Sequence, residues 1–242
     1  NLYIVNYTIY PSGAVNVAAR FTSTDMDAAQ TEVSESTRTA TFTPGRDAAR
    51  KEASKLNVPR IGVRFRLPAS MNQVEYFGRG PAENYLDRNA GSMVGLYKST
   101  AEELYFPYVR PQENGHHTDT RWVSLSTGKK GLLIQADNTI GFNALRNSIE
   151  DFDDEEATGL SRQWSNFTPE QVANHDEAAA KNVLRRQHHI NDITPRDFVE
   201  VCVDLKQQGV AGYDSWGSRP EPAYTLPANR EYNWGFTLIP LK

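Results

Sequence analysis

The sequence predicts an all-β fold, a large antiparallel β sandwich with only short helices. Three observations indicate this class. Apolar and polar residues alternate with a period of two in several stretches, turn-forming residues separate them, and no regular alternation of strands with helices is seen. Many strands joined by irregular turns are typical of a sandwich. We expect one domain over residues 1–242.

Each predicted strand follows from its own alternation. Pro11-Ser12-Gly13 lies between two such runs and predicts a hairpin turn. In the runs that follow, one set of alternate positions is apolar, and its members are Val15, Val17, Ala19 and Phe21; Ile61, Val63, Phe65 and Leu67; Val199, Val201, Val203 and Leu205; and Tyr232, Trp234, Phe236 and Leu238. Each run is bounded by Gly, Pro or polar residues, so each predicts a strand.

Two segments interrupt this pattern. Residues 22–57 are rich in Thr, Ser, Ala and charge, which predicts a long loop or edge hairpin with a short helix near Asp47–Leu56. Thr168-Pro169-Glu170-Gln171 has a capping Thr, Pro at the first helical position and Gln three residues after the cap. We expect a short helix from there to about Asn182.

Composition narrows the function classes. The net charge is −4, from 26 basic and 30 acidic residues, which gives no reason to expect a nucleic-acid partner. Apolar runs such as Gly131–Ile134 are too short to span a bilayer, so we expect no membrane partner. No signal peptide is visible, and the compartment, cytoplasmic or periplasmic, stays open. The single cysteine, Cys202, excludes an internal disulfide. The chain starts without Met inside a strand-like pattern, so we expect a piece of a longer protein.

The run Gly212–Gly217 contains the most informative residue, Trp216. An indole ring is a natural platform for the apolar face of a sugar. The flanking Asp214 and Ser215 can hydrogen-bond hydroxyl groups, and sugar sites combine flat apolar surface with a few polar groups. The alternative is a Trp whose ring folds back onto the core.

Two loops carry further candidates. Gly80–Arg88 crowds acids, an amide and an Arg, which predicts a self-bonded loop with a contact from Arg88 to Glu83 or Asp87. The residues that lead into this loop, Gly78-Arg79-Gly80-Pro81, predict a turn between strands rather than a phosphate loop.

The second loop, Pro107–His117, is rigid at its prolines and turns at Asn-Gly, so it can present Glu113 and Asn114 to a ligand. The pair His116-His117 points in different directions on a strand, and His188-His189 is an equally weak metal signal. We expect no dedicated zinc site.

No catalytic signature stands out. The acidic run Glu150–Glu156 predicts a solvated loop. Glycosidase chemistry needs two acids facing across a pocket, and the sequence places no such pair. Nucleophile-elbow and Walker motifs do not stand out.

Five strings in order resemble the C-terminal domain of the large β-galactosidases of glycoside hydrolase family two, over about Tyr7 to Lys242. They are Pro59–Gly62, Gly78–Arg88, Pro107–Gly115, Thr120–Val123 and Gly212–Gly217. The resemblance implies a super-sandwich related to the galactose mutarotase fold. It also implies that the two catalytic glutamates lie in a separate barrel, so that no catalytic residue is expected in this chain.

The resemblance assigns residue roles as well. Trp216 matches the Trp of an Asp-Ser-Trp string that forms a wall of the sugar pocket, and the Pro-Gln-Glu-Asn-Gly loop matches Glu113 and Asn114. Ala211-Gly212-Tyr213 departs from the paired Gly and acid that the family often has there. Residues 22–57 and 168–182 match poorly, and the family's domain begins earlier, so first strands are expected to be missing. No cofactor is expected in this chain, whereas family enzymes commonly use Mg and Na in other domains.

The expected function is that of a non-catalytic C-terminal domain of a retaining β-galactosidase. Its expected partners are a galactoside and the remaining domains of the parent enzyme. The resemblance leaves open whether the parent enzyme forms a homo-oligomer. Two alternatives stay open. One is a free-standing carbohydrate-binding module with Trp216 as its platform. The other is a mutarotase-like hexose epimerase, which needs a histidine acid and a carboxylate base; its candidate acids are His116, His117, His188 and His189.

Overall fold

The computed structural model describes residues 2–22, 57–152, 190–214 and 217–242. These residues form nine strands, β1 (Leu2–Ile9), β2 (Val15–Thr22), β3 (Arg60–Pro68), β4 (Gln73–Gly80), β5 (Met93–Thr100), β6 (His117–Ser126), β7 (Gly131–Leu145), β8 (Phe198–Gln207) and β9 (Tyr232–Leu241). Their helical structure consists of three 3-10 turns, at Ile149–Asp151, Ile190–Asp192 and Pro222–Tyr224. The all-β prediction is confirmed, including the strands expected from alternation in β2, β3, β8 and β9.

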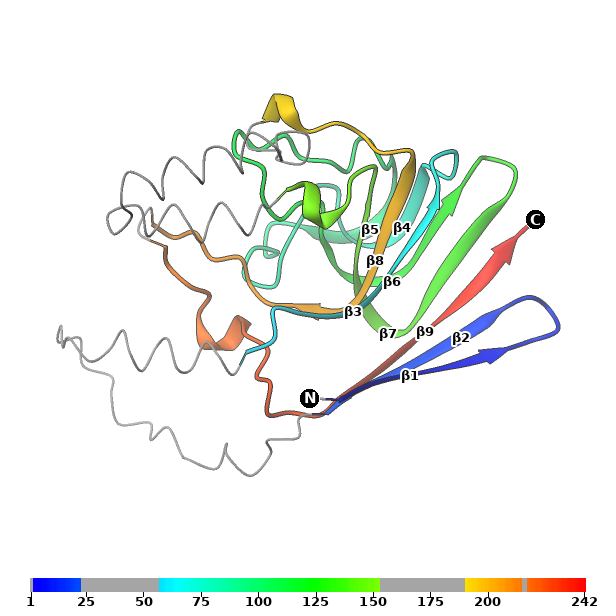
Figure 1. Ribbon diagram of the computed structural model, residues 1–242, viewed down its shortest axis with the longest axis horizontal. Coiled ribbons are helices and arrows are strands. Elements are labelled where there is room, and N and C mark those ends of the chain that lie inside the picture. The colour runs from blue at the N-terminus through cyan, green and yellow to red at the C-terminus, as the bar shows by residue number, and fades with distance from the viewer. Residues whose placement is uncertain (1, 23–56, 153–189, 215–216) are drawn as a thin grey trace, which may run out of the picture.

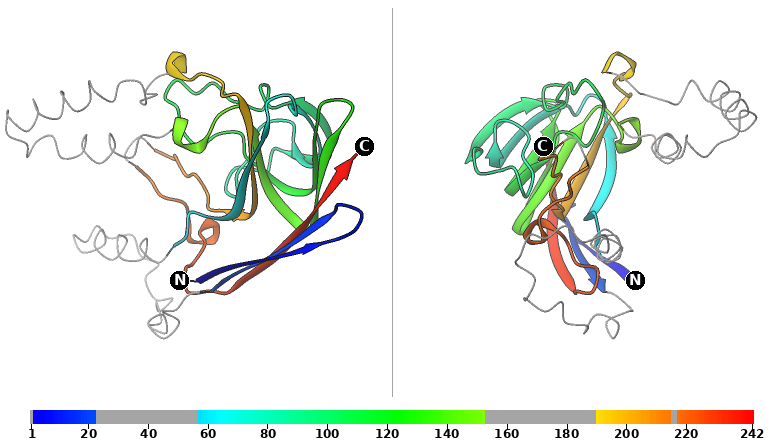
Figure 2. Two further views of the ribbon diagram at one scale, coloured as in Figure 1. Left: turned by 45° about the vertical axis from the view of Figure 1, so that its right-hand side comes forward. Right: turned by 90° about the vertical axis from the view of Figure 1, so that its left-hand side faces the viewer.

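All strand pairs are antiparallel, and the sheet divides at the long strand β7. On one side β7 pairs with β6, and the order continues through β4 to β5. On its other side, residues 131–136 of β7 pair with β9, whereas residues 141–145 pair with β8. Two arms therefore leave β7, β9–β2–β1 and β8–β3, and Figures 1 and 2 show them diverging, an arrangement consistent with a sandwich.

The predicted hairpin turn joins β1 and β2. Ile9 pairs with Val15, and the Tyr10 N–H donates to the Ala14 carbonyl at 2.9 Å. Gly13 has φ +85°, a conformation that glycine adopts without steric cost. The predicted turn at Pro11-Ser12-Gly13 is therefore confirmed.

The core follows from the period-two pattern. On β2 the buried positions are Val17, Ala19 and Phe21, with exposed residues between them. The main cluster gathers inward side chains of β4, β6, β7, β8 and β9, among them Tyr76, Val123, Ile134, Phe142, Val201 and Phe236. A smaller cluster joins Phe21, Ile61 and Leu226.

Strand β8 departs from simple alternation because it is buried on both faces. Its polar residues Glu200 and Asp204 are 3% and 1% exposed, although alternation alone predicts that they face solvent. Arginines of the neighbouring β3 compensate them, since Arg66 Nε lies 3.0 Å from Glu200 and Arg60 Nε lies 3.0 Å from Asp204. A charged layer thus covers the outer face of β8.

Two loop predictions need correction. Gly78-Arg79-Gly80 is part of β4 rather than a turn, because both glycines face the core where β6 and Tyr76 leave no room for a side chain. The acidic run is not wholly solvated, since Asp151 is buried, accepts a hydrogen bond from the Ser148 N–H and pairs with Arg196.

Several expectations lie outside the described residues. They are the helices near 47–56 and 168–182, the character of most of 22–57, residues 153–156 of the acidic run, and His188-His189. None of the helical turns within the described ranges is long and apolar enough to cross a membrane.

The packing at Gly78 generates a stability prediction. A Cβ there would lie 2.4 Å from Thr120 Oγ1 and 2.9 Å from the Thr120 Cα, whereas a Cβ at Gly91 meets nothing within 4 Å. We expect Gly78→Ala to lower the free energy of unfolding by about 1–3 kcal/mol through overpacking. We expect Gly91→Ala to change it by less than about 0.5 kcal/mol. Urea denaturation of both variants checks this, and equal stabilities would contradict it.

Candidate functional site

An open cleft with a volume of about 630 Å³ lies where three chain segments meet. The segments are the loop after β4, the loop before β6, and the chain that leaves β8. The lining residues are Pro59, Tyr85, Arg88, Tyr108, Gln112, Glu113, Gln207, Gln208, Gly209, Val210, Ala211, Gly212 and Pro220. The cleft thus adjoins the segment that leads into Trp216.

One carboxylate, Glu83, joins the first two segments. It pairs with Arg88 at 2.7 Å and accepts hydrogen bonds from the Gly115 N–H at 2.7 Å and the Tyr85 hydroxyl at 3.1 Å. The Tyr108 hydroxyl also donates to it. Its side chain is only 5% exposed, so these bonds replace its lost hydration. The predicted Glu83–Arg88 contact is confirmed.

Asp87 holds the third segment. Its carboxylate accepts from the Val210 N–H at 3.1 Å and the Ala211 N–H at 2.8 Å. Ala211 has φ +57°, and a Cβ on Gly209 would lie 2.4 Å from Asp87 Oδ2. The chain therefore passes close over Asp87 where it forms the wall of the cleft.

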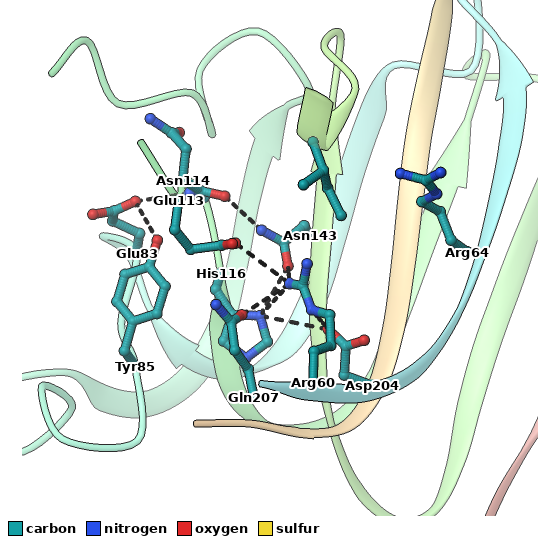
Figure 3. A network of polar contacts seen from close by, with 12 residues as sticks. Arg60, Arg64, Glu83, Tyr85, Glu113, Asn114, His116, Asn143, Asp204 and Gln207 are labelled. Carbon is teal, nitrogen blue, oxygen red and sulfur yellow. Dashed lines mark hydrogen bonds and ion pairs between the residues drawn. The ribbon is translucent and has the colours of Figure 1, made fainter. Parts of the chain in front are cut away.

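Beneath the cleft lies a polar network centred on Arg60, drawn in Figure 3. Arg60 Nη2 donates to Asn143 Oδ1 at 2.6 Å and to Gln207 Oε1 at 2.9 Å, and it lies 3.5 Å from Glu113 Oε1. Its Nε lies 3.0 Å from Asp204 Oδ2. The guanidinium thus connects β3, β7, β8 and the loop before β6.

Asp204 is the buried anion of this network. Burial raises its pKa to about 7, and the Arg60 guanidinium opposes that rise. Its Oδ1 lies where a Cβ of Gly62 would be, at 1.9 Å. Gly62 follows a register shift in β3, so the absence of a side chain there makes room for the carboxylate.

The adjacent histidines are both buried, and they face different surroundings, as the sequence indicated. His116 Nδ1 lies 2.8 Å from Asn143 Oδ1, and the ring stacks on Tyr85. His117 packs against Tyr76 and Phe142. Burial and the nearby Arg60 lower the pKa of His116 to about 3, and burial also lowers that of His117. Both residues are only 1% exposed, and neither lines the cleft.

The predicted ligand contacts Glu113 and Asn114 have different surroundings. Glu113 lines the cleft with a side chain that is 30% exposed. Asn114 is buried, and its amide accepts from the Phe106 N–H and donates to the Phe106 carbonyl, which closes the loop. The Asn-Gly turn is therefore held from within, and it is Glu113 that faces the cleft.

The Asp-Ser-Trp string is described in part. Asp214 Oδ1 accepts from the Ser218 N–H at 3.3 Å, and Ser218 Oγ accepts from the Tyr213 N–H at 3.0 Å. Ser215 and Trp216 lie outside the described residues. The structure therefore places the stem of this loop beside the cleft, since Gly212 and Pro220 line it.

Sequence reasoning missed Arg60, Asp204 and Glu83 as parts of the site. Asp204 stood at an expected solvent-facing position, and no pattern indicated its burial. Arg60 precedes the predicted strand position Val63 by three residues, and Asp204 is a polar position of β8. Their contact could be predicted only from the register of β3 and β8. No cluster of three His, Cys, Asp or Glu suited to a metal occurs among the residues that the structure describes.

Comparison with known proteins assigns the family. Residues 2–238 match the family model of the β-galactosidase small chain. The chain is 35% identical over 185 residues to a β-galactosidase of Priestia megaterium, covering 76% of this chain and 15% of that protein. It is 25% identical over 235 residues to one of Halalkalibacterium halodurans, covering 97% and 18%. The chain therefore belongs to the β-galactosidase small-chain family, as the resemblance of its strings indicated.

The chain spans less than a fifth of the length of these relatives. A β-galactosidase from Arthrobacter sp. shows the same, with 40% identity over 43% of this chain and 11% of that protein. The matched relatives are therefore several times longer than this chain.

The burial of His116 generates a pH prediction. In the unfolded chain His116 takes up a proton near pH 6.5, but in the folded chain it does so only near pH 3. The contribution of neutral His116 to the free energy of unfolding is therefore fully present above pH 6.5 and is lost as the pH falls toward 3. Between about pH 6 and 4, we expect the unfolding free energy of the wild type to fall relative to His116→Gln by about 1.4 kcal/mol per pH unit.

Urea denaturation at a series of pH values measures this difference. Asp204 has a raised pKa and contributes a slope of the opposite sign, but it is present in both proteins. Parallel stability curves for wild type and variant would contradict the prediction.

Proposed function

We propose that this chain is a non-catalytic domain of a retaining β-galactosidase and that it completes the sugar pocket of the parent enzyme. In this proposal the nucleophile and acid/base carboxylates lie in another domain, and Trp216 forms a stacking wall for the galactoside. Asp214 and Ser215 supply polar groups beside the indole that hydrogen-bond sugar hydroxyls, and Glu113 faces the adjoining cleft.

The residues on either side of Ser215 and Trp216 lie beside the open cleft, and this position carries the proposal. The stem residues Gly212 and Pro220 of the Asp-Ser-Trp loop line the cleft, and Asp87 anchors the chain that leads into this loop. A stem held by these hydrogen bonds suits a loop that contributes to a pocket shared with another domain. The matched relatives have ample length for such a domain.

The epimerase alternative receives no support from the described residues. His116 and His117 are buried, and their lowered pKa values keep them neutral at pH 7. A general acid has to contact the substrate.

The purified chain is expected not to hydrolyse nitrophenyl β-galactoside, because the proposed catalytic carboxylates belong to another domain. Spectrophotometric assay after successive purification steps checks this. Turnover that persists through purification and disappears when an acid such as Glu113 is changed to Gln would overturn the proposal.

Replacing the proposed wall residue tests its role in the full-length enzyme. We expect Trp216→Ala to lower kcat/KM for a β-galactoside by about 1–3 kcal/mol of transition-state stabilisation, the scale of a lost aromatic contact. The fold should survive, since a loop-borne side chain adds little to the core.

Tyr10→Ala is the matched control, because it removes an aromatic side chain that is 47% exposed beside the β1–β2 turn. It is expected to leave kcat/KM unchanged. Unaltered kinetics in a folded Trp216→Ala enzyme would return Trp216 to a purely structural role.

A further inference from the structure

We propose that the cleft beside Arg60 is itself a binding subsite for an uncharged saccharide, with Glu113 and Gln207 as hydroxyl-binding residues and Arg60 as the residue that positions them. The residues of this subsite are distinct from Trp216. The choice of galactosides as probes rests on the proposed function.

The charged side chains around the cleft favour a neutral ligand. Arg88, the cation on the cleft wall, pairs with Glu83 at 2.7 Å. Arg60 lies between two carboxylates, Asp204 at 3.0 Å and Glu113 at 3.5 Å. The cations around the cleft are therefore compensated, which disfavours an anionic ligand such as phosphate. A neutral ligand with several hydroxyl groups fits better.

Gln207 and Glu113 place a hydrogen-bond donor and a hydrogen-bond acceptor side by side in the cleft. Gln207 Oε1 accepts from Arg60 Nη2 at 2.9 Å, so the amide nitrogen points away from the guanidinium. Among the described residues this nitrogen has no hydrogen-bond partner, and neither has Glu113 Oε2. Because the same Arg60 nitrogen holds both side chains, the free donor and the free acceptor lie close together. Neighbouring sugar hydroxyls, which both donate and accept, match such a pair.

The rest of the cleft wall combines apolar side chains with backbone that is fixed by hydrogen bonds. Tyr108 and Val210 line the cleft and supply apolar surface, and the backbone of Gly209 to Gly212 forms an edge without large side chains. Glu83 and Asp87 fix these walls by hydrogen bonds across segments. A largely preformed hollow with some apolar surface and a few placed polar groups is typical of a small-molecule site.

Arg60 is needed as an arginine for this arrangement. Its Nε and Nη2 contact Asp204 on one side and Asn143, Gln207 and Glu113 on the other. A lysine has a single nitrogen and cannot hold both sets in a fixed plane. Arg60→Lys is therefore expected to release Glu113 and Gln207 while keeping the positive charge.

The test is an NMR titration of the 242-residue chain with methyl β-galactoside, lactose and, separately, inorganic phosphate. We expect both sugars to shift amide resonances at Glu113 and at 207–212, and phosphate to shift none of these. Glu113→Gln, Gln207→Ala and Arg60→Lys should each raise the Kd about fivefold or more, the scale of one lost hydrogen bond.

Glu75→Gln is the matched control, since Glu75 pairs with Lys98 on the distant β4–β5 surface and is expected to leave the Kd unchanged. The positioning role of Arg60 has its own readout: in a Glu113→Gln, Gln207→Ala background, Arg60→Lys should weaken binding no further. The amide spectrum of each variant reports its fold, and Glu113→Gln, at a partly exposed side chain, keeps the test valid if another variant unfolds.

The proposal would be overturned by the absence of shifts at sugar concentrations far above the millimolar range, by shifts confined to other surfaces, or by equal effects of Glu113→Gln and Glu75→Gln. Phosphate binding at the same residues would also overturn it in favour of an anion site. The proposed function has a separate readout, the kinetics of Trp216→Ala in the full-length enzyme, so either proposal can fail alone.

Discussion

The largely buried guanidinium of Arg60 is the constraint on which the site depends. A charge in the interior has to be compensated by ionic and hydrogen-bonding partners. Here Asp204, Asn143, Gln207 and Glu113 provide them from β8, β7, the end of β8 and the loop before β6. These partners share one guanidinium, so their positions depend on one another. The network therefore couples the position of the cleft floor to the register of the sheet.

That register is set by the unusual pairing of β7. Because its first half pairs with β9 and its second half with β8, the sheet divides into two arms. Asn143 lies opposite Cys202 in the second half, which brings its amide to both Arg60 and His116. A long strand that changes partner thus places the polar floor where the arms diverge.

Two carboxylates tie the loops above this floor to one another. Glu83 ties the loop after β4 to the loop before β6, and Asp87 ties it to the segment after β8. Each carboxylate accepts main-chain N–H bonds, which position backbone without filling space. These bonds fix the backbone that lines the cleft, including the segment that leads to Asp214.

The sequence by itself determined the all-β class, the alternating strands, the hairpin at Pro11–Gly13 and the family, because side-chain periodicity, turn residues and ordered strings are local properties. It also indicated that Arg88 contacts Glu83 or Asp87, and the structure shows the contact with Glu83. Only the tertiary structure decided that Gly78 lies in a strand, that Asn114 closes its own loop and that Asp204 is buried beside Arg60. These features depend on which strands become neighbours, and pairing between residues far apart in the chain leaves no local pattern.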